Sequence, residues 1–160
     1  VRLYLVPYTH FDLALMDLDL DYNLILFRRF MAKVAENLAE SLYAQCLVTG
    51  DNLGQVASQT MENIVSMTKS VQMPILRPLI TYNKEDIVEL SRQLELFDLS
   101  TEPYKDCCAL ISNSPKTKSI HERLDYTEEK YLPDYQQLID DTLAEKQVIA
   151  YTFGKRIEYV

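Results

Sequence analysis

The side chains best suited to chemistry lie in one short segment, residues 47–60, with the sequence LVTGDNLGQVASQT. An apolar strand end leads into a Thr-Gly-Asp-Asn turn at 49–52, and two of the chain's three glycines, Gly50 and Gly54, lie in this segment. Glycine permits positive φ and lets a ligand approach the backbone closely. A helix beginning at Gly54 and Gln55 would present unpaired N–H groups to an anion or a nucleotide. The segment predicts either a nucleotide site at the carboxyl end of a parallel strand or a plain strand-to-helix corner.

Strands and helices alternate around this segment, which predicts a parallel sheet with crossover helices. Apolar residues at helical spacing predict a helix over 24–42, and a short apolar run predicts a strand over 44–48 in a sheet covered on both faces. Asn83 is a good N-cap for a helix over 84–94. The other expected elements are a strand at 1–7, a short helix within the partly acidic stretch 8–23, a helix at 54–69, an extended piece at 74–78, a loop or short strand at 97–108, a polar, mobile loop at 112–126, a helix at 132–147 and a strand-like tail at 148–160.

Composition limits the classes of protein to which the chain can belong. Its 160 residues suit one domain with a real core. Its apolar runs, such as 24–27, are far shorter than the ~20 residues that span a bilayer, so we expect no membrane segment. The net charge of −8 argues against strong nucleic-acid binding by this piece alone. Three cysteines without zinc-type spacing predict neither a disulfide framework nor a metal site.

Segment 47–60 resembles the Val-Thr-Gly-Glu-Ser-Leu-Gly-Gln-Val-Ala-Ser-Gln-Thr segment of the tRNA 4-thiouridine synthetases, also called tRNA sulfurtransferases (ThiI family). Four further segments match in order along the chain: FRRFM at 27–31, LRPLI at 76–80, DCC at 106–108 and SPKTK at 114–118. The similarity covers residues 1–130, which we expect to be part of an ATP-dependent sulfurtransferase (PP-loop) domain. The C-terminal helix and tail, 131–160, lie outside it.

This resemblance implies an α/β fold of the adenine nucleotide α-hydrolase-like (PP-loop) type, with a parallel sheet flanked by helices. It implies that ATP, bound with magnesium, adenylates a uridine of tRNA. AMP is a far better leaving group than a carbonyl oxygen, so a persulfide sulfur donated by a cysteine desulfurase can replace it to give 4-thiouridine. The same sulfur relay would supply thiazole synthesis for thiamine, and the location would be cytoplasmic.

Carried over position by position, the resemblance implies that Arg28, Gly50 and Gln59 contact the nucleotide. Gly50 would allow the ligand to approach the backbone closely, and Gln59, expected in the helix after the turn, would hydrogen-bond the ligand. Arg28 would reach the nucleotide from the preceding helix. Without the family, an exposed position on an amphipathic helix is the simpler expectation for Arg28.

The second implied site is the adjacent pair Cys107 and Cys108. The family's catalytic cysteine resolves the persulfide by forming a disulfide, and Cys108 is the matching position. A thiolate is the reactive form, which neighbouring Lys105 would favour and Asp106 would oppose. Without the family, two adjacent cysteines are more often inert than catalytic.

Two other polar side chains are weaker candidates for the nucleotide site. Asp51 could be an acid that lies near the nucleotide or near a metal-bound water. It could equally be a turn residue whose side chain hydrogen-bonds its own backbone. His10 and Phe11 resemble a nucleotide-binding His-Phe pair of the family, but the family's pair lies upstream of the position that aligns with Val1. We therefore expect His10 to be structural or exposed.

The family's pyrophosphate loop, Ser-Gly-Gly-x-Asp-Ser, does not occur in this sequence, and neither do its tRNA-binding domains. We therefore expect an N-terminally truncated piece that binds ATP poorly and does not catalyse adenylation unaided. The alternatives are a noncatalytic structural or interaction module of the same fold, or an enzyme of this fold that adenylates a small molecule. A sheet without its first strands would expose an edge, through which a homodimer could form.

Overall fold

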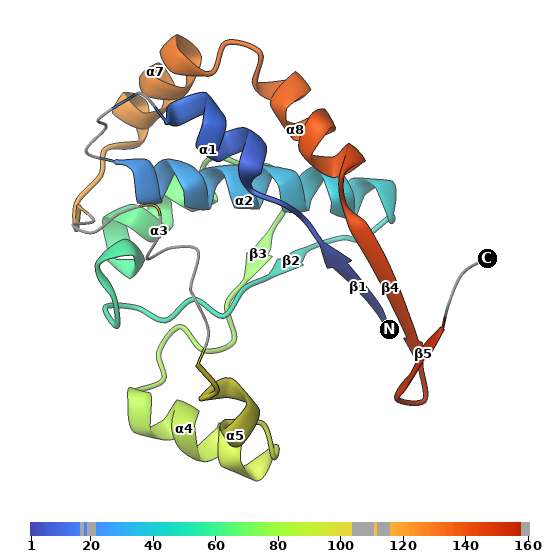
Figure 1. The fold of residues 1–160 in the computed structure, drawn as a ribbon. Coiled ribbons are helices and arrows are strands. Elements are labelled where there is room, and N and C mark those ends of the chain that lie inside the picture. The colour runs from blue at the N-terminus through green and yellow to red at the C-terminus, as the bar shows by residue number, and fades with distance from the viewer. Residues whose placement is uncertain (17, 19–21, 104–110, 112–115, 158–160) are drawn as a thin grey trace.

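Helices and two small sheets make up the fold (Figure 1). The computed structural model describes residues 1–16, 18, 22–103, 111 and 116–157. The strands are β1 (Arg2–Leu5), β2 (Leu47–Val48), β3 (Ile75–Leu76), β4 (Gln147–Thr152) and β5 (Lys155–Ile157). The helices are α1 (Thr9–Leu15), α2 (Asn23–Ser41), α3 (Met61–Thr68), α4 (Lys84–Gln93), α5 (Phe97–Ser100), α7 (His121–Tyr131) and α8 (Tyr135–Ala144), with a 3-10 turn, η1 (Ala57–Gln59). The expected α/β class is confirmed.

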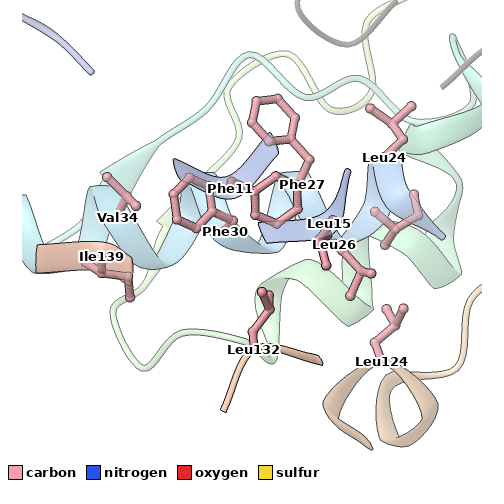
Figure 2. Close-up of a cluster of buried hydrophobic side chains, with 11 residues drawn as sticks. Phe11, Leu15, Leu24, Leu26, Phe27, Phe30, Val34, Leu124, Leu132 and Ile139 are labelled. Atoms are coloured by element: carbon pink, nitrogen blue, oxygen red, sulfur yellow. The ribbon is translucent and has the colours of Figure 1, made fainter. Parts of the chain in front are cut away.

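Helix α2 lies at the centre of the hydrophobic core, and the helix predicted over 24–42 is confirmed. The four consecutive residues 24–27 are each at most 6% exposed, although they point in different directions around the helix. This is possible because α1, α3 and α8 all pack against α2. The other core members, drawn in Figure 2, come from α2 itself and from its neighbours: Phe11, Leu15, Phe30, Val34, Leu124, Leu132 and Ile139. The core therefore holds α2 firmly in place as a support for its polar side chains.

Strands β2 and β3 form a parallel pair, as expected. Leu47 lies opposite Ile75, and Val48 lies opposite Leu76. The connection between them runs through η1 and α3, the kind of crossover that parallel neighbours require. Since both strands end at the same edge, the turns that follow Val48 and Leu76 lie next to each other. The expectation that this sheet is covered on both faces is wrong for the described residues, because Val48 is 64% and Leu76 is 53% exposed.

Strand β1 belongs to a second, antiparallel sheet. It pairs with β4, and β4 pairs with β5, so the N-terminal strand and the C-terminal hairpin lie together. The hairpin turn consists of Phe153 and Gly154, both at positive φ, which is the conformation that a two-residue turn between antiparallel strands favours. The strands expected at 1–7 and in the tail are confirmed as elements, while their pairing with each other was not anticipated.

The helix expected from Gly54 begins only at Met61, so that prediction is wrong over its first two turns. Thr60 has an extended backbone, and its Oγ1 accepts a hydrogen bond from the backbone N–H of Asn63. Thr60 is therefore the N-cap of α3, and the chain before it forms a turn and η1 instead of a helix.

Three expectations for the C-terminal half also need correction. The segment 112–126, expected as a polar, mobile loop, contains the start of α7 at His121, because Leu124 is fully buried in the core. The stretch 97–108 begins with the short helix α5, and residues 104–110 lie outside the described part. The last helix, α8, is shorter than the expected 132–147 and begins after Pro133.

Helices α4 and α5 pack on each other and lie apart from the helical core (Figure 1). The expected cap of α4 is confirmed: Asn83 Oδ1 accepts from the N–H of Asp86 at 2.8 Å, and the Asp86 side chain accepts from the N–H of Asn83. None of the described helices is long and apolar enough to cross a membrane.

Candidate functional site

The turn after β2 is the centre of the candidate site. The backbone N–H of Thr49 donates to the carbonyl of Leu76, which extends the parallel pairing just beyond β2. Gly50 follows and is exposed, and a Cβ built there would meet no atom within 4 Å. Its backbone is not at positive φ, whereas that of Gly54 is, at 78°. Gly50 is therefore not required by the conformation of the turn, and it leaves the backbone open to the surroundings.

Asp51, the acid of this turn, is held by three side chains. Its carboxylate is about 5% exposed and accepts hydrogen bonds from Arg28 Nη2, from Thr49 Oγ1 at 2.9 Å and from Arg77 Nε at 3.1 Å. Burial alone would raise the pKa of Asp51, but the hydrogen bond and charge of Arg28, with the hydrogen bonds of Thr49 and Arg77, outweigh it and hold that pKa below 3.8. Asp51 thus links two arginines from different elements, which is more than the local turn contact considered from the sequence.

Arg28 points from α2 toward this turn. Its side chain is 11% exposed, and besides Asp51 its Nη2 lies 3.5 Å from Met67 Sδ of α3. The exposed position that the helix pattern alone favoured is therefore wrong. Arg28 contacts Asp51, which is the residue directly after Gly50. The role of Arg28 as a nucleotide contact stays a prediction.

Gln59 approaches the same turn from the other side. Its Oε1 accepts a hydrogen bond from the backbone N–H of Asn52 at 3.3 Å, and its carbonyl accepts from the N–H of Gly54 at 2.9 Å. Gln59 was expected inside a helix, but it is the last residue of η1. It therefore closes the loop that Gly54 opens, and its side chain lies beside the backbone that follows Gly50.

Asn52 and Arg77, which the sequence argument did not single out, tie this turn to the segment after β3. Asn52 is 4% exposed, and its Nδ2 donates to the carbonyls of Leu79 at 2.7 Å and of Tyr82 at 2.6 Å. Arg77 follows β3 directly and reaches Asp51. The signal that could have found Arg77 was topological, because adjacent parallel strands bring their following residues together.

The predicted catalytic residue Cys108, and Cys107 beside it, lie outside the described residues. The chain that follows them is described at residue 111 and again from residue 116, where it returns to the start of α3. There Asn63 Nδ2 donates to the carbonyl of Lys116 at 3.0 Å and Thr60 Oγ1 donates to the carbonyl of Thr117 at 2.6 Å. The segment downstream of the cysteines is thus fastened within a few residues of Gln59.

A buried ionic cluster holds α7 in place behind this segment. Arg29 is 1% exposed and donates through Nε and Nη2 to both oxygens of Glu128, each at 2.8 Å, and through Nη2 to Asp125. Burial alone would lower the pKa of Arg29, but the hydrogen bonds and charges of Glu128 and Asp125 outweigh it and raise that pKa. Lys33 Nζ also donates to Glu128 at 2.8 Å, so α2 and α7 are joined by charged hydrogen bonds.

His10 has a structural role, as expected: it is half-buried, and its Nε2 lies 3.1 Å from Glu145 Oε1, so α1 contacts the end of α8. Among the described residues, no group of three or more His, Cys, Asp or Glu side chains lies close enough to hold a metal ion.

Comparisons with known proteins give matches of three kinds. A family model described as thiamine biosynthesis protein (ThiI) matches residues 1–132. The probable tRNA sulfurtransferase of Brevibacillus brevis is 39% identical over 149 residues, which is 92% of this chain and 37% of that protein. The crystal structure of a 4-thiouridine synthetase–RNA complex with bound ATP is 33% identical, with a TM-score of 0.83 over 98% of this chain and 39% of that one. The chain spans well under half the length of these two relatives.

Proposed function

The chain belongs to the ThiI family of tRNA sulfurtransferases, and on that premise we propose that it is part of the ATP-dependent sulfurtransferase domain of a tRNA 4-thiouridine synthetase. Its fold is the α/β, PP-loop-type fold of the solved relative. The observation that carries the proposal is the convergence of Arg28, Gly50 and Gln59 on one turn at the carboxyl edge of a parallel strand pair. That edge is where open α/β sheets bind their ligands.

We assign the nucleotide contacts to these three residues. Gly50 offers an open backbone, and Gln59 offers a carboxamide beside it. Arg28 brings a positive charge to the same turn, which suits the phosphate groups of ATP or AMP. The solved relative was crystallised with bound ATP, which supports a nucleotide as the ligand. Magnesium would enter with the phosphates of ATP.

In the proposed reaction, the uridine oxygen attacks the α-phosphorus of ATP and pyrophosphate leaves. A persulfide sulfur then attacks the activated ring carbon, and AMP leaves with the former carbonyl oxygen. The transferred sulfur is then still bonded to the cysteine that carried the persulfide. Cys108 would attack the sulfur of that cysteine to form a disulfide, which leaves the transferred sulfur on the base as 4-thiouridine.

The proposed partners follow from this reaction. The relative in complex with RNA supports tRNA as the substrate. A cysteine desulfurase would supply the persulfide, and the same sulfur would serve thiamine thiazole synthesis, in keeping with the description of the family. We place the reaction in the cytoplasm, and a homodimer could form through an edge of the two-stranded β2–β3 sheet.

The alternative is a noncatalytic module of the same fold, which the missing pyrophosphate loop favours. The two functions differ in one measurable property. A part of the enzyme retains a weak nucleotide site, whereas a module does not need one. We further propose that this chain alone does not adenylate tRNA.

The test is calorimetric titration of this chain with ATP and AMP. We expect weak binding that Gln59→Ala reduces further, since this variant removes the carboxamide next to Gly50. The matched control is Gln93→Ala, which removes an exposed glutamine of α4 whose side chain donates a hydrogen bond to Glu89 of the same helix. Binding that is absent, or that Gln59→Ala and Gln93→Ala change equally, would favour the noncatalytic module.

A further inference from the structure

The two arginines that share Asp51 use their donors differently. Arg77 has all three of its guanidinium nitrogens engaged: Nε on Asp51 at 3.1 Å, Nη2 on Thr68 Oγ1 at 2.8 Å and Nη1 on the carbonyl of Ile75 at 3.4 Å. Within the part of the chain that the structure describes, Arg28 makes hydrogen bonds through Nη2 alone. Arg28 therefore keeps Nε and Nη1 for another acceptor, whereas every guanidinium nitrogen of Arg77 already makes a hydrogen bond.

We propose that Asp51 and Arg77 are positioning residues of the nucleotide site, which orient Arg28 and keep its positive charge available to the phosphate groups of the nucleotide. This inference rests on the proposed function, since it assigns the acceptor for the two remaining nitrogens of Arg28. Asp51, Arg77 and Arg28 are together called the arginine clamp below.

The charge of the clamp explains why two arginines are present. A single Asp51–Arg28 pair would be neutral, and Asp51 would then cancel the charge that an anionic ligand needs. Arg77 supplies a second positive charge on the other oxygen of Asp51, so the clamp carries one positive charge in excess. The surplus lies beside the open backbone of Gly50, at 11% side-chain exposure for each arginine, where solvent screens it only in part.

The geometry explains the orientation of Arg28. A long arginine side chain loses considerable rotamer freedom when a ligand fixes it, which weakens binding unless the protein has already fixed it. Asp51 fixes Arg28 Nη2, and the position of Asp51 is itself fixed by Thr49 and by Arg77. Arg77 in turn is fixed by the carbonyl of Ile75 in β3 and by Thr68 at the end of α3. The clamp therefore joins α2, the turn after β2 and the turn after β3.

Orientation and simple electrostatics predict opposite results for one substitution. Asp51→Asn removes a negative charge, so electrostatics alone would tighten the binding of ATP. If the carboxylate orients Arg28, the same variant weakens ATP binding, because Arg28 and Arg77 then repel each other without the anion between them. Asp51→Glu keeps the carboxylate and should restore most of the affinity, as the glutamate in the family segment at this position suggests.

The experiment measures the affinity of this chain for ATP and for adenosine by NMR titration. For Asp51→Asn and for Arg77→Met we expect ATP binding to weaken roughly tenfold, the order expected for a misdirected or lost unit charge near the ligand. Adenosine has no phosphate, so its affinity should change less than about twofold, within the range of distant substitutions. Circular dichroism establishes that each variant is folded, and if Asp51→Asn does not fold, Arg77→Met tests whether the clamp contributes to ATP binding.

The possible results separate the two proposals. ATP affinity in Asp51→Asn or Arg77→Met that equals or exceeds that of the unsubstituted chain would overturn the clamp and leave the nucleotide site intact. Equal losses for ATP and adenosine in folded variants would mean that the clamp is only structural, and would also overturn the inference. If the unsubstituted chain binds neither ligand, the proposed nucleotide site fails, and the role of the clamp fails with it.

Discussion

Glu128→Gln is expected to destabilise the chain strongly, because it breaks the charged contact between α2 and α7. Glu128 is 5% exposed and accepts three hydrogen bonds, two from Arg29 and one from Lys33, all at 2.8 Å. Glutamine has nearly the same shape, but its NH2 group would face donor groups of Arg29 and Lys33. One of the two oxygens is therefore lost as an acceptor, and the charge of Arg29 is left without its main partner.

The magnitude follows from burial. Removing one partner of a buried ion pair costs about 3–5 kcal/mol, because the other charge stays buried. Part of this loss is recovered here, since Arg29 still donates to Asp125 and to the carbonyl of Ser66. We therefore expect about 2–4 kcal/mol, a large fraction of the 5–15 kcal/mol that stabilises a typical domain.

Urea unfolding, followed by circular dichroism, measures this loss. The matched control is Glu129→Gln, the next residue on α7, which is exposed; it should change the free energy of unfolding by less than about 0.5 kcal/mol. A loss below about 1 kcal/mol for Glu128→Gln, or an equal loss in the control, would refute the view that this buried pair fastens α7.

Three further predictions concern other buried or reactive groups. Burial, and next the Glu128 carboxylate, raise the pKa of Tyr135 well above 10.0; Tyr135→Phe should cost less than about 1 kcal/mol at neutral pH and should reduce the loss of stability that follows as pH rises above 10.0, measured by urea unfolding. The folded pKa of Asp51 lies below its ordinary 3.8, so the contribution of its carboxylate to stability is present above pH 3.8 and is lost as pH falls below it. The difference in the free energy of unfolding between the unsubstituted chain and Asp51→Asn should therefore shrink in acid. A constant difference would contradict the ion pairs assigned to Asp51. In a chimera that carries this chain in place of the corresponding part of the Brevibacillus brevis relative, Cys108→Ala should abolish 4-thiouridine formation in tRNA while Cys107→Ala retains it; thiolation by the Cys108→Ala chimera would remove the catalytic assignment.

Local patterns in the sequence predicted the elements that depend on local interactions. The apolar spacing of α2 and the Asn83 cap of α4 are contained within each helix, and both predictions are confirmed. The parallel pairing of β2 with β3 also followed from the alternation of strands and helices. These features need only the period of the side chains and the chemistry of the helix ends.

The elements that sequence analysis missed depend on distant partners. Helix α7 is mostly polar, and its place in the core depends on Leu124 and on the contact of Glu128 with Arg29, ninety-nine residues away. The delayed start of α3 depends on Thr60, whose hydroxyl both caps the helix and contacts Thr117. A pattern confined to neighbouring residues contains neither contact.

The candidate site was predictable in its residue types but not in its geometry. The turn at 49–52 and Gly50 were evident from glycine placement, and Arg28 and Gln59 came from the resemblance to the family. The inward direction of Arg28 and the contact of Arg77 with Asp51 depend on how α2 crosses the parallel strand pair, which the sequence does not show. Asp51 is buried between both arginines for the same reason, and a carboxylate in a turn does not by itself reveal such partners.

The most direct test of the nucleotide site is an NMR titration of isotope-labelled chain with ATP, in which each backbone amide and the Arg28 Nε–H are followed separately. We predict that the largest shift changes occur at Gly50, Asn52 and Gln59 and at the Arg28 side chain, while the amides of α4 and of the β4–β5 hairpin stay unchanged. Changes concentrated away from the turn after β2, or none at millimolar ATP, would contradict the assignment of this turn as a nucleotide site.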